Sequence, residues 1–309
     1  MTKKRLFAMA IALVFAFLLA GCRSKVEAEP QMMQIIEAPT TKTTEPAAST
    51  ATTDSSASST ESSTIATTEA TTTTSSVPPE QPKSELDLYK EESIRLVGNK
   101  KQLNGIDISE YQSGQNWKGY IDESDAVILR YSAGTSKDDC FDEMMAYAKE
   151  KHKLVGIYFF TNNITWRDRD PAEYARWCID QTRDYLGYAV YVLDAEGGNI
   201  LDTNWILTYL RTFKEETGIK PVLYTGQHKL NQAASTESTA EAMRTIRSES
   251  YGLWIARYGE NDGEVYEFEV FLWEENKVFG HQYVSAVEHL DRDIFFCTPE
   301  AWYKYAQTS

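Results

Sequence analysis

The chain has 309 residues, of which 42% are hydrophobic, and its net charge is −15. The charge is uneven, because residues 1–100 carry 10 basic and 12 acidic side chains whereas residues 101–309 carry 21 and 34. This acidity argues against nucleic acid as a partner, and against attraction to a bare anionic membrane surface, since both are negatively charged.

The first 22 residues have the layout of an export signal. Lys3, Lys4 and Arg5 precede an apolar run over residues 6–19, which is too short for a permanent transmembrane helix. The run ends in Leu19-Ala20-Gly21-Cys22, which resembles the lipobox of bacterial lipoproteins. The resemblance implies a signal peptide over residues 1–21, a lipid anchor on Cys22, and an extracytoplasmic protein held at the cell membrane, facing the cell wall. An ordinary signal peptide with a chance cysteine is the alternative.

Residues 22–100 are expected to form a linker. Between residues 40 and 79, 24 of 40 positions are Ser or Thr. Such a stretch buries too little apolar surface to offset the entropy lost on ordering. We therefore expect a disordered stalk, followed by a single domain of ordinary enzyme size over residues 101–309.

Strand and helix patterns alternate within residues 101–309. Strands are expected at residues 105–109, 126–131, 154–160, 189–194 and 220–224, with later candidates at 252–256, 279–283 and 290–295. Helices are expected at residues 138–151, at 171–186, where Pro171 suits the first turn, and at 203–217, closed by Gly218. This α/β alternation predicts a parallel sheet, and the number of units favours a barrel. Residues 229–250 and 259–275 fit the alternation poorly.

Cysteine and histidine residues form no metal-binding pattern. The cysteines Cys140, Cys178 and Cys297 lack C-x-x-C spacing, and the histidines His152, His228, His281 and His289 lack H-x-x-x-H spacing. We therefore predict no metal and no cofactor. Three buried thiols are favoured for the cysteines, and one disulfide with a leftover thiol is the alternative.

Acidic residues gather where the expected strands end. Asp194 and Glu196 close the strand at 189–194 and point to the same side if the strand continues through them, since side chains two apart in a strand share a face. Asp107 ends the first strand, and Asp291 or Asp293 lies in the last. Barrel enzymes carry their chemistry at the C-terminal ends of strands. Carboxylates clustered there are typical of glycoside hydrolysis, in which one acid is protonated and another ionised. Acids that only cap loops or helices are the alternative, above all for Asp107.

Eight short motifs stand in order along the domain, at residues 105–109 with Gln112 and Trp117, then at 128–135, 156–160, 193–196, 217–225, 254–258, 281–283 and 290–293. In this order they resemble the glycoside hydrolase family 25 muramidases, or Chalaropsis-type lysozymes, over about residues 104–297. The chain departs from the family pattern at Ala133, Phe159, His281 and Asp293, the last of which is commonly Asn.

The resemblance implies an irregular, TIM-like (β/α) barrel that hydrolyses the β-1,4 bond between N-acetylmuramic acid and N-acetylglucosamine in peptidoglycan glycan strands. It implies that Glu196 is the general acid and that Asp194 orients the substrate's own acetamido group, which attacks the sugar with retention. Asp107 and Asp291 would line the cleft and tune the acid.

Six further side chains are expected to contact the sugars, namely Tyr111, Tyr158, Tyr224, Trp254, Tyr258 and Gln282. Core packing is the alternative for each aromatic residue, and Tyr158, Tyr224 and Trp254 are favoured as sugar contacts. We expect a monomer. The alternative functions are a catalytically silent peptidoglycan-binding lipoprotein and a spacer domain that serves the stalk.

Overall fold

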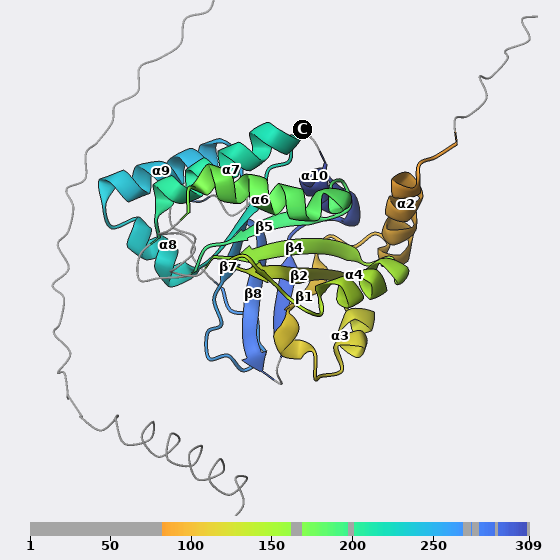
Figure 1. Cartoon of the computed structure of the whole chain (residues 1–309). Helices are drawn as coiled ribbons and strands as arrows, with labels where there is room; N and C mark the ends of the chain where they lie inside the picture. The colour runs from red at the N-terminus through yellow and green to blue at the C-terminus, as the bar shows by residue number, and fades with distance from the viewer. Residues whose placement is uncertain are drawn as a thin grey trace, which may run out of the picture. The chain divides into compact units, whose positions relative to one another are not determined.

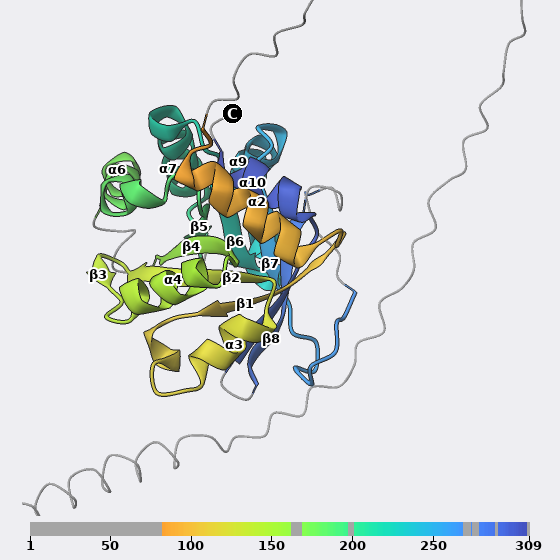
Figure 2. The same cartoon turned by 90° about the vertical axis from the view of Figure 1, so that its right-hand side faces the viewer.

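The structure is a computed structural model that describes residues 82–161, 169–196, 201–267, 273, 278–287 and 290–307. Within these residues eight strands close into a barrel, because β1 pairs with β2 on one side and with β9 on the other (Figures 1 and 2). The barrel strands are β1 (Leu103–Ile108), β2 (Ala126–Ala133), β4 (Leu154–Phe160), β5 (Val190–Asp194), β6 (Val222–Gly226), β7 (Leu253–Ala256), β8 (Val278–Val287) and β9 (Leu290–Phe295). A short strand, β3 (Ser136–Lys137), extends the edge of β2. The α/β barrel expected from the sequence is confirmed.

Among the eight barrel strands, direction differs from the expected parallel sheet at one strand, β9. The six pairings that lead from β1 to β8 are parallel. β9 runs antiparallel to both of its neighbours. The reason is that β9 follows β8 through a short hairpin, and strands joined without a crossover run antiparallel. The start of β9 therefore lies at the same end of the barrel as the C-terminal ends of the parallel strands.

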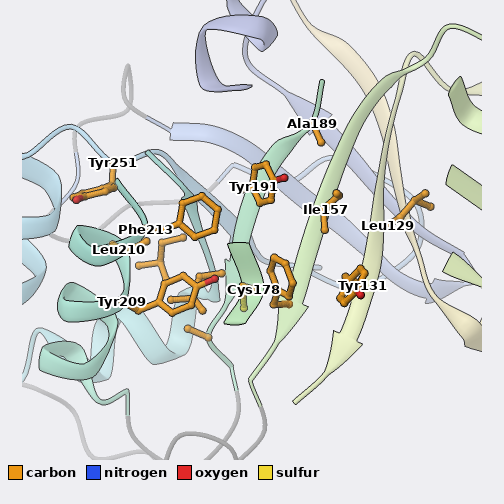
Figure 3. Packing of buried hydrophobic residues seen from close by; sticks show 14 of the residues in the cluster. Leu129, Tyr131, Ile157, Cys178, Ala189, Tyr191, Tyr209, Leu210, Phe213 and Tyr251 are labelled. Atoms are coloured by element: carbon orange, nitrogen blue, oxygen red, sulfur yellow. The ribbon is translucent and has the colours of Figure 1, made fainter. Parts of the chain in front are cut away.

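Helices cover the outside of the barrel and form most of the hydrophobic core with it. They are α3 (Trp117–Glu123), α4 (Phe141–Glu150), α6 (Pro171–Thr182), α7 (Thr203–Thr217), α8 (Gln227–Ala233) and α9 (Glu237–Ser248). Figure 3 shows Tyr209 and Phe213 of α7 packed toward Tyr191 on the outer face of β5. Local signals fix the helix ends: the Asp170 carboxylate accepts backbone N–H groups at the start of α6, and Gly218 ends α7 at a φ of 75°.

The poorly fitting residues 229–250 form two consecutive helices, α8 and α9, between β6 and β7. Ala240, Met243 and Ile246 recur every three residues along α9 and are buried. Two helices in a row break the strand–helix alternation. This break explains why the sequence pattern was unclear there.

One end of the barrel, where the parallel strands begin, is covered by α2 (Glu85–Val97) and α10 (Pro299–Ala306), which pack together (Figure 2). The Tyr89 hydroxyl donates to the Lys153 carbonyl at 2.6 Å, just before β4, and the Trp302 indole donates to the Val155 carbonyl at 3.2 Å. Helix α2 lies within residues 22–100, the expected linker. The folded domain therefore begins upstream of the expected start at residue 101.

Apolar side chains fill the barrel interior toward the end where the parallel strands begin. The Phe295 ring crosses it so closely that a Cβ atom would lie 2.1 Å from this ring at Gly105 and 2.5 Å at Gly280. Only glycine fits at these two positions of the barrel wall.

The three cysteines of the domain are unpaired thiols. Cys178 and Cys297 are buried, as favoured from the sequence, but Cys140 is partly exposed. Among the described residues there is no helix long and apolar enough to cross a membrane.

Candidate active site

A pocket of about 460 Å³ opens at the C-terminal ends of the parallel strands. All ten side chains expected in the site line it: Asp107, Tyr111, Tyr158, Asp194, Glu196, Tyr224, Trp254, Tyr258, Gln282 and Asp291. The alternation of inward and outward side chains along each strand brings these residues together. Distant parts of the sequence thus supply one site.

The acids enter the pocket from two sides. Asp107 of β1 and Asp291 of β9 are directly paired in the antiparallel register. Asp194 is the last residue of β5, and Glu196 follows two residues later. Asp107 and Asp194 are 6% and 4% exposed, whereas Glu196 is exposed at the mouth. One acid is therefore accessible while two lie deeper.

Burial and mutual repulsion favour the protonated forms of these acids. Burial, and then the charges of Asp291 and Asp293, raise the pKa of Asp107 well above its ordinary value. Burial and the Glu196 charge raise the pKa of Asp194 in the same way, although Arg130 opposes this. A backbone hydrogen bond from Glu196 also opposes the rise, but no described donor reaches the buried Oδ1 atom of Asp194.

Glu196 combines exposure with a raised pKa. Although water reaches its side chain, partial desolvation by the pocket walls raises the pKa of Glu196 above its ordinary value, and the Asp291 charge adds to this effect. Lys229 of α8 acts in the opposite direction. An accessible carboxyl that retains its proton is suited to general acid catalysis.

Two buried threonines, which the sequence analysis did not single out, hold the backbone between Asp194 and Glu196. The Thr161 hydroxyl and backbone N–H both donate to the Asp194 carbonyl. From the other side, the Thr225 hydroxyl donates to the Ala195 carbonyl at 3.0 Å. The segment that carries both acids is thereby fixed to β4 and β6. Thr225 lies inside one of the family-like motifs, which is the signal that could have found it.

Gln282 is buried and positions Asp107, so it is not an exposed sugar contact. It is 3% exposed, and its amide nitrogen donates to Asp107 Oδ2 at 2.7 Å. Its amide oxygen accepts from the hydroxyls of Tyr224 at 2.7 Å and Tyr258 at 2.8 Å. This network fixes the orientation of Asp107.

The favoured aromatic residues differ in what they offer a ligand. Trp254 is 1% exposed and Tyr224 is 5% exposed, so both present little surface to a sugar. Tyr158 and Tyr258 are half-buried, and Tyr111 is 76% exposed. Tyr111 therefore offers the largest free aromatic face, although Tyr224 and Trp254 were favoured from the sequence.

Arg130 supports Tyr111 and was also missed as a site residue. Its guanidinium is 6% exposed and is bound to Asp138 at 3.0 Å and to Glu110 at 3.2 Å. It lies 4.8 Å from the centre of the Tyr111 ring. An arginine inside the apolar strand AVILRY is the sequence signal for this role, because a buried charge requires partners.

The β8–β9 hairpin positions Asp291. The backbone N–H of Ala286 donates to Asp291 Oδ1 at 2.6 Å. The Asn261 side chain bonds both the N–H and the carbonyl of Ser285, at 3.0 and 2.9 Å. The segment after β7 thus holds the hairpin that carries one of the acids. In the described part of the chain, no group of His, Cys, Asp and Glu side chains has the geometry of a metal site.

A closed barrel with carboxyl groups gathered at the C-terminal ends of its strands has the architecture and the site of a glycoside hydrolase. Residues 106–291 match the model of the glycosyl hydrolases family 25, and the chain belongs to this family. It is accordingly a glycoside hydrolase.

Solved structures share the fold at low sequence identity. A muramidase from Trichobolus zukalii is 21% identical with a TM-score of 0.52, and the match covers 67% of this chain and 100% of that one. A family GH25 lysozyme from Aspergillus fumigatus is 18% identical with a TM-score of 0.51, over 67% and 99%. The bacterial lysozyme from Streptomyces coelicolor is 19% identical with a TM-score of 0.52, over 66% and 96%. Comparison with curated proteins gives no significant match.

Proposed function

We propose that this enzyme is an N-acetylmuramidase that cleaves the β-1,4 bond between N-acetylmuramic acid and N-acetylglucosamine in peptidoglycan. The observation that carries the proposal is the contrast at the end of β5, where an exposed Glu196 with a raised pKa follows a buried Asp194. The family match spans the whole pocket, and similar structures bear the names muramidase and lysozyme.

In the proposed reaction Glu196 gives its proton to the glycosidic oxygen as the bond from that oxygen to C1 breaks. The carbonyl oxygen of the substrate's acetamido group attacks C1 from the opposite face. Asp194 accepts a hydrogen bond from the acetamido N–H and stabilises the positive charge. Water then attacks C1 and gives its proton to the ionised Glu196, so the acetamido group is restored and the product keeps the β configuration.

The remaining groups prepare the pocket for this step. Asp291 disfavours ionisation of Glu196, and Asp107 holds the substrate from the side of β1. The exposed ring of Tyr111 is suited to stacking against a sugar face. Since all four expected acids face one pocket, the geometry favours an active enzyme over a silent binding module.

We also propose that the enzyme is a monomeric lipoprotein, anchored through Cys22 on the outer side of the cell membrane. Residues 1–81, which include the expected signal peptide and most of the expected linker, lie outside the described residues. This proposal therefore rests on the lipobox-like sequence at Cys22 and on the apolar run before it.

Digestion of defined peptidoglycan, with the products identified by mass spectrometry, tests the function. A muramidase leaves N-acetylmuramic acid at the new reducing end, whereas a glucosaminidase leaves N-acetylglucosamine. NMR of the anomeric proton early in the digestion should show the β product first, and a thiazoline mimic of the cyclised intermediate should inhibit. An initial α product would mean inversion by an activated water, with Asp194 or Asp107 as the base. Folded enzyme that binds walls and releases nothing would instead be a silent binding module.

A further inference from the structure

A further carboxyl group, which the reaction above does not use, lies behind the pocket on β9. Asp293 is 1% exposed and follows Asp291 by two residues, so both side chains point into the barrel. In the strand register Asp293 pairs with Gly105 on β1. Gly105 has no side chain, so the nearest side chain of β1 that points into the barrel beside Asp293 is that of Asp107.

The Asp107 and Asp293 carboxyl groups each accept one hydrogen bond from a neighbouring side chain, and they also contact each other. Trp254 Nε1 donates to Asp293 Oδ1 at 2.9 Å, and Gln282 Nε2 donates to Asp107 Oδ2 at 2.7 Å. Asp293 Oδ2 is buried, and among the described residues no N–H or hydroxyl donor reaches it. The Asp107 and Asp293 carboxyl groups lie within hydrogen-bonding contact of each other. Ionised carboxyl groups only accept, so this contact is a hydrogen bond only when one of the two carries a proton.

We propose that Asp107 and Asp293 share one proton, which Asp107 donates to Asp293 Oδ2, and that Asp293 is a positioning residue that keeps Asp107 uncharged in the pocket. The pair forms one O–H···O hydrogen bond, and no covalent bond between heavy atoms changes. Nearly isosteric Asn at position 293 would offer Asp107 an amide donor in place of a carboxylate acceptor, and Asp107 would then ionise.

The surroundings of the pair are predominantly acidic. The titratable and charged groups around it inside the barrel are Asp291 of β9, Tyr158 of β4, Asp194 of β5 with Glu196 beyond it, Tyr224 of β6, Tyr258 after β7 and Arg130 of β2. Arg292 lies between the two inward acids of β9 and therefore points to the opposite face, where it interacts with Tyr283 of β8. The charge of Arg130 is already engaged by Asp138 and Glu110. Burial and neighbouring acids raise the pKa of both Asp107 and Asp293. Retaining one proton relieves the repulsion among these buried charges.

The role of the pair in catalysis rests on the proposed muramidase reaction. A neutral Asp107 presents no charge to the substrate. Of these two buried acids only Asp194 can then supply negative charge beside the reacting sugar, and a protonated Glu196 no longer repels that charge. The protonation of the pair, in contrast, is a property of the folded site and can be measured without substrate.

Carbon-13 NMR of the full chain labelled at its aspartate carboxyl carbons tests the proposal. In the parent, the Asp107 carboxyl should titrate well above the ordinary range for aspartate. In Asp293→Asn the Asp107 signal should titrate at much lower pH, and in Asp107→Asn the Asp293 signal should move down likewise. Asp122→Asn, which removes a surface acid that contacts Tyr147, is the matched control and should leave the Asp107 titration unchanged.

Two results would overturn the shared proton. If Asp107 keeps its high titration in Asp293→Asn, burial alone holds the proton. If every aspartate of the parent titrates in the ordinary range, no proton is shared, and this measurement does not depend on whether the variants fold. Absence of muramidase activity with the high titration intact would count against the proposed function and not against the pair.

Discussion

At the scale of single residues, the end of β5 gives two neighbouring acids different settings. Asp194 is the last residue inside the strand and is 4% exposed, whereas Glu196 lies just past the strand and is exposed. Two acids of similar intrinsic pKa can take separate roles when their environments differ, and here the environments differ over only two residues.

Replacing Glu196 with Gln tests its role as the acid. The amide keeps the shape of the side chain but cannot donate a proton in the same way, so turnover on purified walls should fall by about 10²–10⁴. Release of reducing ends measures turnover, and co-sedimentation with walls should show that binding persists. Glu216→Gln, at an exposed pair with Arg176, is the control and should keep full activity. A Glu196→Gln enzyme with most of its activity would move the acid elsewhere, with Asp107 the first candidate.

The pH dependence of turnover should respond to Asp291. An acid catalyst is lost as the pH rises through its pKa, so the alkaline limb of kcat reports Glu196. Pocket desolvation and then the Asp291 charge raise the pKa of Glu196. Removing that charge in Asp291→Asn should lower the pKa of Glu196 and move the alkaline limb to lower pH. Kinetics over a pH series measure the limb. A limb that stays in place or moves to higher pH would show that Asp291 does not tune Glu196.

The four acids of the site could be predicted from the sequence because they stand in short motifs at strand ends. The supporting residues could not. Thr161 and Thr225 act through hydrogen bonds to the backbone of a neighbouring strand, and such partners are known only once the strand order is known. The exposure of the aromatic residues could not be predicted from the sequence either. Trp254 is buried against Asp293, whereas Tyr111 is exposed.

At the scale of elements, long apolar or strongly capped segments were predictable. α7 begins and ends as expected at Thr203 and Thr217, and β4 matches residues 154–160. The direction of β9 depends on a hairpin, and α2 gains its partner α10 only in the folded chain. These features depend on tertiary contacts that local patterns do not contain.

Tyr89 tests whether α2 belongs to the folded domain. Its ring is 6% exposed and its hydroxyl is bound to the Lys153 carbonyl, so Tyr89→Ala should lower the free energy of unfolding by about 3–5 kcal/mol. Tyr89→Phe keeps the ring and should cost about 1–2 kcal/mol. Denaturant unfolding measures both, and KM should not change because α2 lies at the end of the barrel away from the pocket. Equal stability of Tyr89→Ala and the parent would mean that α2 contributes nothing to the domain.

At the scale of the whole molecule, charge and anchoring act in opposite directions. Residues 101–309 carry 21 basic and 34 acidic side chains, so the domain gains no attraction to an anionic envelope. A lipid at Cys22 would supply proximity by another route.

Substitution of Cys22 tests the anchor. Cys22→Ala should move the protein from the detergent phase to the aqueous phase in phase partitioning, because no acyl chain can then be attached. Cys140→Ala, which removes a partly exposed thiol within the domain, is the control and should stay in the detergent phase. If Cys22→Ala partitions as the parent does, the protein is not held by a lipid on that residue. Wall digestion in solution should be the same for all three proteins.

Helix α2 covers the end of the barrel where the strands begin, so its N-terminal end lies away from the pocket. A force applied to the N-terminal end of α2 would therefore act first on the contact between α2 and α10, and not on the strand ends that carry the acids. The same arrangement makes the N-terminal end of α2 a suitable point for immobilisation. A bead or carrier protein attached there leaves the pocket accessible to a long polymer.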